Sequence, residues 1–409
     1  MLVILWSPRV LQSSSSVLSL LDIAMVMLLA EIIFWASLGT LVYVYLGHLI
    51  LLMAMSRVRR EVVLKADIFP SVSVIVCAYN EERHISRKID NCLELEYPRD
   101  KMEIIVVSDG SQDGTNAVLE EMTKRYPFLK THCMPERSGK TACQNVAIQM
   151  ARNEVLFLTD ATTVHPGNAL RLLVRSLNDP SVGCVTGKPV FKPDIGLIST
   201  GQEKRDRYEY YLRSKLGQVK SLFGAQDCIY AIPRNLYPPI RPDLDSGFVG
   251  PLKILEKGYR TVYEPEAVAI VDRRPPNIKD EFIRRSRIML RGMRGLLHMR
   301  QLMNPFKHGF LAVSLISSRL LRWLTPVWLV TLLSANIFLL NSSFYLVAFL
   351  LQVGFYVAAA VAFLLEQNGY RPNIVFSVPL YVCTLAAAAA DGLRRLLAGE
   401  SGQMWQTRR

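Results

Sequence analysis

The chain has 409 residues, of which 50% are hydrophobic, so it is longer than one ordinary domain and too apolar to be wholly soluble. Its 48 Lys and Arg residues against 35 Asp and Glu residues give a net charge of +13, which suits nucleic acid, anionic lipid or an anionic substrate. Because no basic motif with interleaved aromatic residues occurs, the sequence predicts membrane lipids and nucleotide phosphates as partners, and no nucleic acid.

The N-terminal segment, residues 1–60, is predicted to be a membrane segment. The sequence from Val17 to Met55 is almost entirely apolar, and a run of about 20 such residues spans a bilayer. Ile32 to Met55 is the firmest crossing, with Leu18 to Ala30 as its extension or as an interfacial piece. A basic cluster at residues 56–60 follows, which predicts that the next part of the chain is cytoplasmic.

Residues 66–300 predict one α/β domain. Short apolar runs alternate with helix-length segments, a pattern typical of a parallel sheet. The seven cysteines are scattered, so a reducing, cytosolic setting is expected rather than a disulfide framework. The expected strands are 72–76, 104–107, 154–158, 182–191, 224–232 and 260–270. The expected helices follow the first strand and cover 116–126, part of 136–153, and 201–220.

The segment from Gly201 to Lys220 is rich in charge and contains clustered tyrosines. Mixed-charge helices of this kind usually face solvent. The sequence therefore predicts a solvated helix face here rather than part of a site. The histidines His84, His132 and His165 lack metal-ligand spacing and are expected on the surface or in loops.

Polar side chains follow the first, second and third predicted strands of this domain. Asp109 and Asp160 each end an apolar run, and the carboxyl ends of parallel strands share one rim where ligands bind. Two carboxylates with diphosphate oxygens suit a divalent cation, and Lys140, in a glycine-containing loop, could meet a phosphate. An ordinary turn with capping carboxylates is the alternative.

A helix near the end of this domain carries arginines at spacings of three and four: Arg284, Arg287, Arg291 and Arg294. This spacing places them on one helix face. The face could bind a diphosphate, or it could anchor the chain to anionic lipid headgroups at the membrane. The sequence leaves both open.

The C-terminal part of the chain again predicts membrane helices. Residues 301–322 are expected to form an interfacial helix, residues 323–397 membrane helices, and residues 398–409 a basic tail. Leu324 to Leu340, Phe344 to Leu365 and Ile374 to Ala390 are each long enough to cross. Three crossings would place the basic tail outside, against the charge rule. One of the three is therefore expected to be re-entrant or interfacial.

Five motifs occur in order between about residues 71 and 300: AYNEE, VVSDGSQDGT, ERSGKTACQNVAI, LTDATT and LEKGYRTVYEPEAVA. Together they resemble the family 2 glycosyltransferases, in particular the membrane-embedded members related to hyaluronan, chitin and cellulose synthases. The resemblance implies a GT-A, Rossmann-like α/β domain in the cytoplasm, flanked by transmembrane α-helices of a multi-pass cell-membrane protein. It also implies a nucleotide-diphosphate-sugar donor.

The resemblance assigns roles to particular residues. Asp160 would be the first position of the metal-binding D-x-D motif, whose last position is here Thr162, and the cofactor would be Mg²⁺ or Mn²⁺. Lys140 would lie near the donor. The uracil and ribose end of a UDP-sugar would be held by Ala78, Tyr79, Asn80, Glu81 and Asp109.

The implied reaction is inverting. A carboxylate base takes a proton from the acceptor hydroxyl, and cations stabilise the leaving diphosphate. For the cations, Arg287 and Arg291 resemble the family's Q/R-x-x-R-W element, with Gly292 where tryptophan would stand, which weakens a polymerase interpretation.

The acidic motif departs most from the family pattern. It resembles S-D-F-V-E-P-L elsewhere, but residues 246–252 carry Gly247 and Gly250 at the acidic positions. Asp243 and Asp245 are the candidate replacements for the base, and an ordinary loop carboxylate is the alternative for Asp245. The segment 224–227 resembles G-A-D-G with its acid displaced by one position.

The sequence therefore predicts a membrane glycosyltransferase that uses a nucleotide sugar and a lipid-linked or glycan acceptor. The alternative is a catalytically degenerate subunit that binds nucleotide sugar and regulates a partner synthase. A transporter is disfavoured because few ionisable residues interrupt the C-terminal spans. The tail from Trp405 to Arg409 resembles a W-x-x-T-R element that could close over the donor, or it is a disordered end. The sugar, the acceptor and the oligomeric state stay open.

Overall fold

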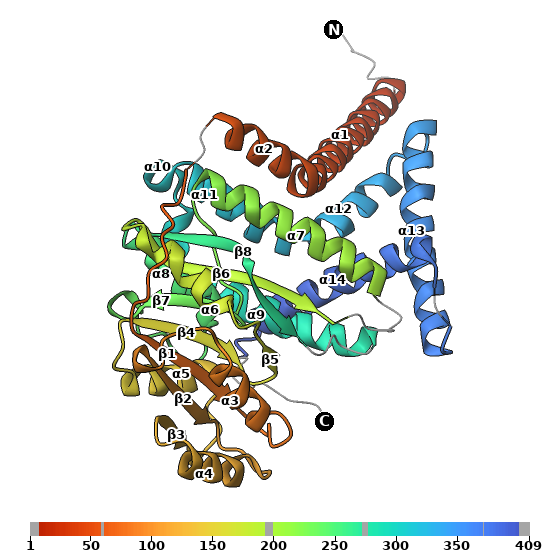
Figure 1. Cartoon of the computed structure of the whole chain (residues 1–409). Helices are drawn as coiled ribbons and strands as arrows, with labels where there is room; N and C mark the ends of the chain where they lie inside the picture. The colour runs from red at the N-terminus through yellow and green to blue at the C-terminus, as the bar shows by residue number, and fades with distance from the viewer. Residues whose placement is uncertain (1–7, 59–60, 193–198, 272–276, 371, 401–409) are drawn as a thin grey trace, which may run out of the picture.

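The computed structural model consists of a mixed sheet domain beside a group of long apolar helices (Figure 1). The structure describes residues 8–58, 61–192, 199–271, 277–370 and 372–400. In Figure 1, α1 and α13 extend away from the sheet, whereas α7, α9 and α14 lie between the sheet and the outer helices. The tail beginning at Trp405 lies outside the described residues.

The sheet has eight strands in the order β3-β2-β1-β4-β7-β6-β8-β5. Strands β1, β2, β3 and β4 pair in parallel, and β6 pairs with β8 in parallel. The pairs β4–β7, β6–β7 and β5–β8 are antiparallel. The bounds are β1 Val72–Ala78, β2 Met102–Ser108, β3 Leu129–Cys133, β4 Val155–Asp160, β5 Thr163–Val164, β6 Val182–Phe191, β7 Tyr230–Pro233 and β8 Arg260–Val271.

The central strands β1, β2 and β4 are almost wholly buried, as strands covered on both faces require. Side chains alternate between the two faces. Ile75 and Cys77 of β1 face the core that includes α5, while Val74 and Val76 face the core that includes α3 and α4.

The sheet differs from the predicted one in three respects. It is mixed rather than parallel, because β7 runs against its neighbours. Strands β3 and β5 were not predicted: β3 is a short edge strand with one buried residue, and β5 has two residues, so neither has a marked apolar pattern. Strand β7 begins at Tyr230 rather than at Gly224.

The helices of the domain lie between the strands in the sequence. Helix α5 begins directly after Gly139, whose φ of 92° is a conformation that glycine adopts without strain. Helix α8 begins after Asp245, whose side chain accepts a hydrogen bond from the backbone N–H of Phe248, as an N-cap does. The bounds are α3 Ile85–Leu93, α4 Thr115–Arg125, α5 Lys140–Met150, α6 Ala169–Val174, α7 Ser199–Val219, α8 Ser246–Glu256 and α9 Ile278–His298.

Three stretches are long and apolar enough to cross a membrane: Asp22–Val58, Ser343–Gln367 and Ile374–Leu397. Large apolar side chains of α1 and α13 are exposed on their surfaces, for example Ile32, Leu350 and Leu351. The helical elements outside the sheet domain are α1 Pro8–Val42, the π-helical turn η1 Tyr43–Gly47, α2 His48–Val58, α10 Pro305–His308, α11 Phe310–Leu315, the π-helical turn η6 Ile316–Leu321, α12 Thr325–Ile337, α13 Ser343–Gln367 and α14 Ile374–Leu397.

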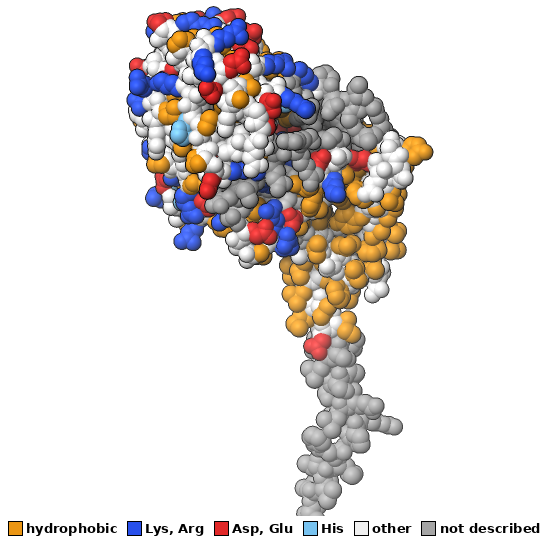
Figure 2. All heavy atoms as spheres, turned by 90° about the horizontal axis from the view of Figure 1, so that it is seen from below, with side chains coloured by type: hydrophobic (Ala, Val, Ile, Leu, Met, Phe, Trp, Pro, Cys, Tyr) orange, Lys and Arg blue, Asp and Glu red, His pale blue; other side chains and the backbone are white. Residues whose placement is uncertain are grey.

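Figure 2 shows how apolar and charged side chains divide the molecule. Hydrophobic side chains gather on the part that projects from the domain, while Lys, Arg, Asp and Glu side chains are spread over the domain itself. This division is the one expected of a water-soluble domain attached to helices that lie in lipid.

The first of the three expected C-terminal crossings is not a simple span. Helix α12 has 13 residues, fewer than the roughly 20 that cross a bilayer. The helical pair Phe310–Leu321 and Thr325–Ile337 is bent by 67°, as in a broken span or a re-entrant loop. The bend is compatible with the expected re-entrant segment and equally with a broken span that crosses, so this expectation stays a prediction. The expected interfacial helix over residues 301–322 is divided into the 3₁₀ turn η5 Arg300–Met303, α10, α11 and η6.

Helix α9 connects the domain to the membrane helices by packing closely on α14. A Cβ atom at Gly392 of α14 would lie 3.0 Å from Met289 Cβ and 3.1 Å from Leu290 N of α9. The hydroxyl of Ser286 donates to Asp391. This close approach is possible because residue 392 is glycine and has no side chain.

We predict that Gly392→Val destabilises the protein, because the new side chain forces α14 away from α9. Overpacking of this kind costs about 1–3 kcal/mol. The measurement is thermal unfolding of the full chain in lipid, with Gly354→Val of α13 as the matched control, since a Cβ at Gly354 meets no atom within 4 Å. Equal unfolding temperatures for the two variants would contradict the packing described.

Candidate functional site

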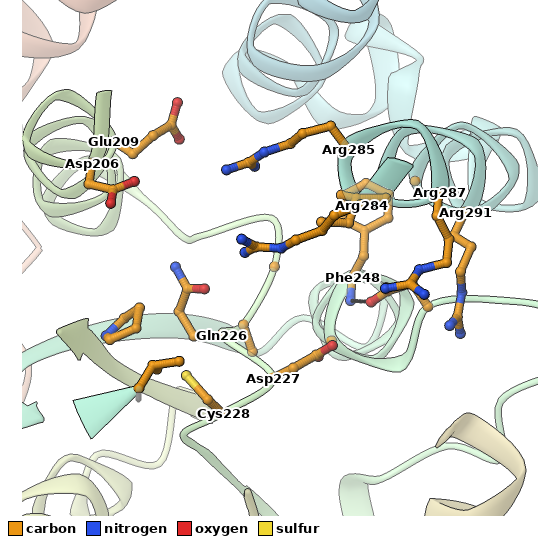
Figure 3. A pocket seen from close by; sticks show the side chains of 18 of the residues that line it. Asp206, Glu209, Gln226, Asp227, Cys228, Phe248, Arg284, Arg285, Arg287 and Arg291 are labelled. Atoms are coloured by element: carbon orange, nitrogen blue, oxygen red, sulfur yellow. Dashed lines mark hydrogen bonds between the residues drawn. The ribbon is translucent and has the colours of Figure 1, made fainter. Parts of the chain in front are cut away.

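A cavity of about 440 Å³ opens where the carboxyl end of β4 faces α7, α9 and the link between η6 and α12. Figure 3 shows arginines of α9 on one side of it and the segment Gln226 to Cys228 on the other. Five of the predicted site residues line this cavity: Lys140, Asp160, Asp245, Arg287 and Arg291. The predicted carboxylate rim and the predicted arginine face therefore meet in one place.

Lys140 lies at the centre of the carboxylate side. Its Nζ atom is 2.5 Å from Asp160 Oδ1 and 3.5 Å from Asp227 Oδ2. Asp160 is the last residue of β4 and Lys140 the first of α5, so the lysine reaches across the strand ends. Lys140 is expected to meet a phosphate of the donor, and in this structure its partners are carboxylates.

Asp109 organises the loop before α5. Its buried carboxylate accepts hydrogen bonds from the backbone N–H groups of Ser138 at 2.7 Å and of Gly139 at 2.9 Å. A Cβ atom at the neighbouring Gly110 would lie 2.6 Å from Arg137 N. As expected, Asp109 and Asp160 lie at the same edge of the sheet. Asp109 follows β2 and Asp160 ends β4, and these two strands flank β1. Asp109 does not line the cavity.

The residues expected at the nucleotide end form the adjoining rim, outside the cavity lining. The guanidinium of Arg137 lies 3.8 Å from the ring centroid of Tyr79. Asn80 has a φ of 54°, and its Oδ1 accepts from the backbone N–H of Gln112 at 2.8 Å. Ala78 is the buried end of β1, and its carbonyl accepts from Asp109 N. These contacts join the loops after β1 and β2.

Glu81 belongs to the same rim and is buried. Burial, together with the negative charges of Asp160 and Asp113, raises the pKa of Glu81 to about 7. Its carboxylate lies 3.0 Å from His84 Nδ1. Thr162 is half-buried in the turn after β4 and does not line the cavity.

The arginine side of the cavity is formed by α9. Arg291 donates to Leu244 O at 2.7 Å and to Thr141 Oγ1 at 3.1 Å. Arg287 makes no hydrogen bond or ion pair with any residue that the structure describes. Burial and the nearby charge of Arg291 lower the pKa of Arg287 to about 10. Arg287 thus forms no ion pair among the described residues, although the negative charge of Asp245 partly opposes this lowering of its pKa.

Helix α7 contradicts the prediction of a solvated face. It packs against α2, α14 and β8, and five of its side chains line the cavity: Arg205, Asp206, Glu209, Tyr210 and Arg213. Burial raises the pKa of Glu209, but the positive charge of Arg322, with those of three further arginines, outweighs burial and lowers this pKa to about 2. The four-residue spacing of these side chains could have predicted a shared cavity-facing side, because it places them on one face of the helix.

The two predicted candidates for the base have different surroundings. Asp245 lines the cavity, but it also caps α8 by accepting from Phe248 N at 3.0 Å. Asp243 lies outside the cavity lining and makes two hydrogen bonds with Arg241, at 3.0 Å and 2.9 Å. The geometry therefore gives Asp243 no route to a substrate in this cavity.

Asp227 was not among the predicted catalytic residues, yet it lines the cavity. Burial raises the pKa of Asp227, the charge of Lys140 opposes this shift, and the charges of Asp245 and Asp160 add to it. The displaced acid in the 224–227 motif was the sequence signal for this residue.

Gly292 stands at the position where the family's Q/R-x-x-R-W element has tryptophan, but another residue occupies the space beside it. A Cβ atom at Gly292 would lie 2.8 Å from Cη2 of Trp323. Trp323 comes from the link between η6 and α12, lines the cavity, and packs edge-on against Phe248. An aromatic ring is thus present beside Arg291, supplied by a different segment.

A buried network supports the loop that carries Asp160. Lys88 donates to Thr159 Oγ1 at 2.9 Å and to Thr163 O at 2.7 Å. His165 lies 2.7 Å from the same hydroxyl and is buried. His165 lies in the loop after β5, as expected of a surface or loop residue, but it is buried there because its ring completes this network.

Comparison with protein families identifies the domain. The family described as "Glycosyl transferase family 2" matches residues 73–231. Residues 73–231, less than half of the chain, are therefore similar to the family 2 glycosyltransferases. The matched region runs from β1 into β7 and contains Lys140, Asp160 and Asp227.

Curated relatives match this glycosyltransferase domain over part of their length. "Probable glycosyltransferase YdaM" of Bacillus subtilis is 35% identical over 123 residues, 29% of this chain and 29% of that protein. "Poly-beta-1,6-N-acetyl-D-glucosamine synthase" of Staphylococcus epidermidis is 32% identical over 165 residues, 39% of this chain and 38% of that protein. The matches thus span well under two thirds of these relatives.

A solved structure is similar over almost the whole chain. "Mannosyltransferase PcManGT" from Pyrobaculum calidifontis, in complex with GDP-Man and Mn²⁺, has a TM-score of 0.68 at 23% identity. The similarity covers 92% of this chain and 99% of that one. The GT-A-like fold of the glycosyltransferase domain is confirmed by this likeness.

We predict that Lys88→Met loosens the loop that carries Asp160. The change preserves length but removes the donor to Thr163 O and one of the two partners of Thr159 Oγ1, and an unsatisfied buried group costs about 1–3 kcal/mol. Thermal unfolding of the full chain measures the effect. Lys124→Met is the control, because Lys124 is an exposed member of a surface pair and such pairs contribute little. A Lys88 variant as stable as the control would contradict the role of the network.

Proposed function

We propose that the protein is an inverting glycosyltransferase that transfers a sugar from a nucleotide-diphosphate sugar, a UDP-sugar in the first instance, to a hydroxyl of a lipid-linked or glycan acceptor. Lys140 with Asp160 and Arg287 with Arg291 line the same cavity, and this observation carries the proposal. A donor with a diphosphate needs both a charged anchor and cations for the leaving group.

The roles of the cavity residues follow from their charge and position. Arg287, which forms no ion pair with a described residue, would stabilise the nucleoside diphosphate as it leaves, and Arg291 would assist from the same helix face. Asn80, Glu81 and the backbone around Asp109 would hold the nucleoside at the adjoining rim. The loop held by Asp109 would place Lys140 beside the donor.

A divalent cation fits this site only together with a donor. Among the described residues, no group of three or more His, Cys, Asp and Glu side chains is arranged to hold a metal. The carboxylate oxygens of Asp160 suit Mg²⁺ or Mn²⁺, and Mg²⁺ commonly binds through one or two carboxylates plus substrate phosphates. Thr162 could contribute a hydroxyl from the following turn. When bound, the cation would neutralise charge on the diphosphate.

The helices support a membrane-bound acceptor. The cavity includes Trp323 and Arg319, which belong to the bent apolar segment, so an acceptor in the membrane would reach it over a short distance. The basic residues after the first apolar helix favour a cytoplasmic domain in a multi-pass cell-membrane protein.

The test of this function is release of nucleoside diphosphate from a panel of UDP- and GDP-sugars, by the full chain in lipid with Mg²⁺ or Mn²⁺ and a lipid extract as acceptor. We expect turnover, and a fall in kcat of about 10²–10³-fold for Arg287→Ala, the size seen when one stabilising group is removed. Asp100→Ala, an exposed change far from the cavity lining, is the matched control.

Two outcomes would contradict the proposal. A wild-type chain that binds no nucleotide sugar has no donor site. A chain that binds a donor tightly but releases no diphosphate is a nucleotide-sugar-binding subunit without catalysis, and the absence of acidic side chains at Gly247 and Gly250 is the feature that favours that second function.

A further inference from the structure

Transfer to a hydroxyl needs a base within the cavity, and the cavity offers five carboxylates: Asp160, Asp206, Glu209, Asp227 and Asp245. A base must accept the proton of the acceptor hydroxyl, so the carboxylate whose present partners hold it least strongly is the best placed. The contacts of the five differ enough to separate them.

Four of the five carboxylates are engaged. Asp160 is 2.5 Å from Lys140 Nζ, and Glu209 is 2.5 Å from an Arg322 nitrogen. Asp206 pairs with Arg205. Asp245 caps α8, so its removal from that bond would leave a helix terminus unsatisfied.

Asp227 is the least engaged of the five. Its Oδ2 atom has a single ionic neighbour, Lys140 Nζ at 3.5 Å, and that ammonium group is held more closely by Asp160. Its Oδ1 atom is buried and has no hydrogen-bond partner among the described residues, whereas the side chain as a whole is 37% exposed. Figure 3 shows Asp227 extending from the Gln226 to Cys228 segment toward the side of the cavity on which Phe248, Arg287 and Arg291 lie.

The Asp227 carboxylate occupies space that is open because residue 247 is glycine. A Cβ atom built on Gly247 would lie 1.8 Å from Asp227 Oδ1 and 2.9 Å from Asp227 Cγ. Any side chain at position 247 would thus occupy the same space as the Asp227 carboxylate. The equivalent atom on Gly250 would meet only Ile240 Cδ1, at 3.4 Å. The acid missing from position 247 is replaced in space by one from position 227.

We infer that Asp227 is the catalytic base of this chain, supplying from the segment before β7 the carboxylate that α8 lacks at Gly247. The inference rests on the proposed glycosyltransferase function. Asp227 takes the proton of the acceptor hydroxyl, and the hydroxyl oxygen forms its bond to the anomeric carbon from the face opposite the leaving group. The bond between that carbon and the diphosphate oxygen breaks, and the diphosphate keeps the electron pair.

The test compares steady-state kinetics of full-length variants in lipid, with the donor that wild type turns over. We expect Asp227→Asn, which preserves shape, to lower kcat by about 10²–10⁴-fold, the range for loss of general base catalysis, while the donor KM changes less than threefold. A role confined to the ion pair with Lys140 would instead raise the donor KM or lower the unfolding temperature. The paired variant Asp227→Gly with Gly247→Asp returns a carboxylate to α8, and we expect it to exceed Asp227→Gly at least tenfold in kcat.

The inference is overturned if Asp227→Asn keeps more than a tenth of the wild-type kcat, as it would if the acceptor were a phosphate that needs no deprotonation. It is overturned equally if Asp245→Asn loses as much activity as Asp227→Asn. A paired variant no better than Asp227→Gly also contradicts the spatial replacement. Failure of the proposed function is a separate result, because wild type would then release no diphosphate from any donor.

Discussion

The close packing of α9 against α14 is the constraint on which the site depends. One face of α9 approaches α14 at Gly392, where Met289 and Leu290 fill the space of a side chain. The other carries Arg287 and Arg291 into the cavity. A shift of α9 relative to the membrane helices would therefore move the arginines relative to the carboxylates at the sheet edge. The membrane helices are in this sense part of the site, since they fix one of its walls.

The second wall depends on the parallel part of the sheet. Strands β2, β1 and β4 are adjacent, so their carboxyl ends bring Asp109 and Asp160 to one edge although the two are far apart in the sequence. Asp109 is used locally, to hold the loop that leads to Lys140. The ammonium of Lys140 then keeps carboxylates close together that would otherwise repel one another.

The sequence was sufficient to predict this rim because buried strands give continuous apolar runs and end at polar residues. It was also sufficient for the arginine face, where spacings of three and four define one side of a helix. It failed for α7, because a mixed-charge helix has the same composition whether it faces solvent or a polar cavity. It failed for β3, where an edge strand has one buried residue.

Two glycines mark where family patterns and this chain diverge, and at both the missing side chain is supplied from elsewhere. Trp323 fills the space at Gly292, and Asp227 fills the space at Gly247. Neither replacement could be predicted from local sequence, because the substitute residues lie 31 and 20 positions away in the chain. A motif with an altered residue is therefore weak grounds for assigning loss of activity when a neighbouring segment can occupy the same space.

The central claim is that the carboxylate rim and the arginine face bind one nucleoside diphosphate between them. Hydrogen exchange of the full chain in lipid, with and without nucleoside diphosphate and Mn²⁺, tests it most directly. The account predicts slower exchange in residues 136–140, 224–228 and 284–291 together, with no change in residues 129–133 at the far edge of the sheet. Protection of the sheet loops without protection of residues 284–291, or no protection at all, would contradict it.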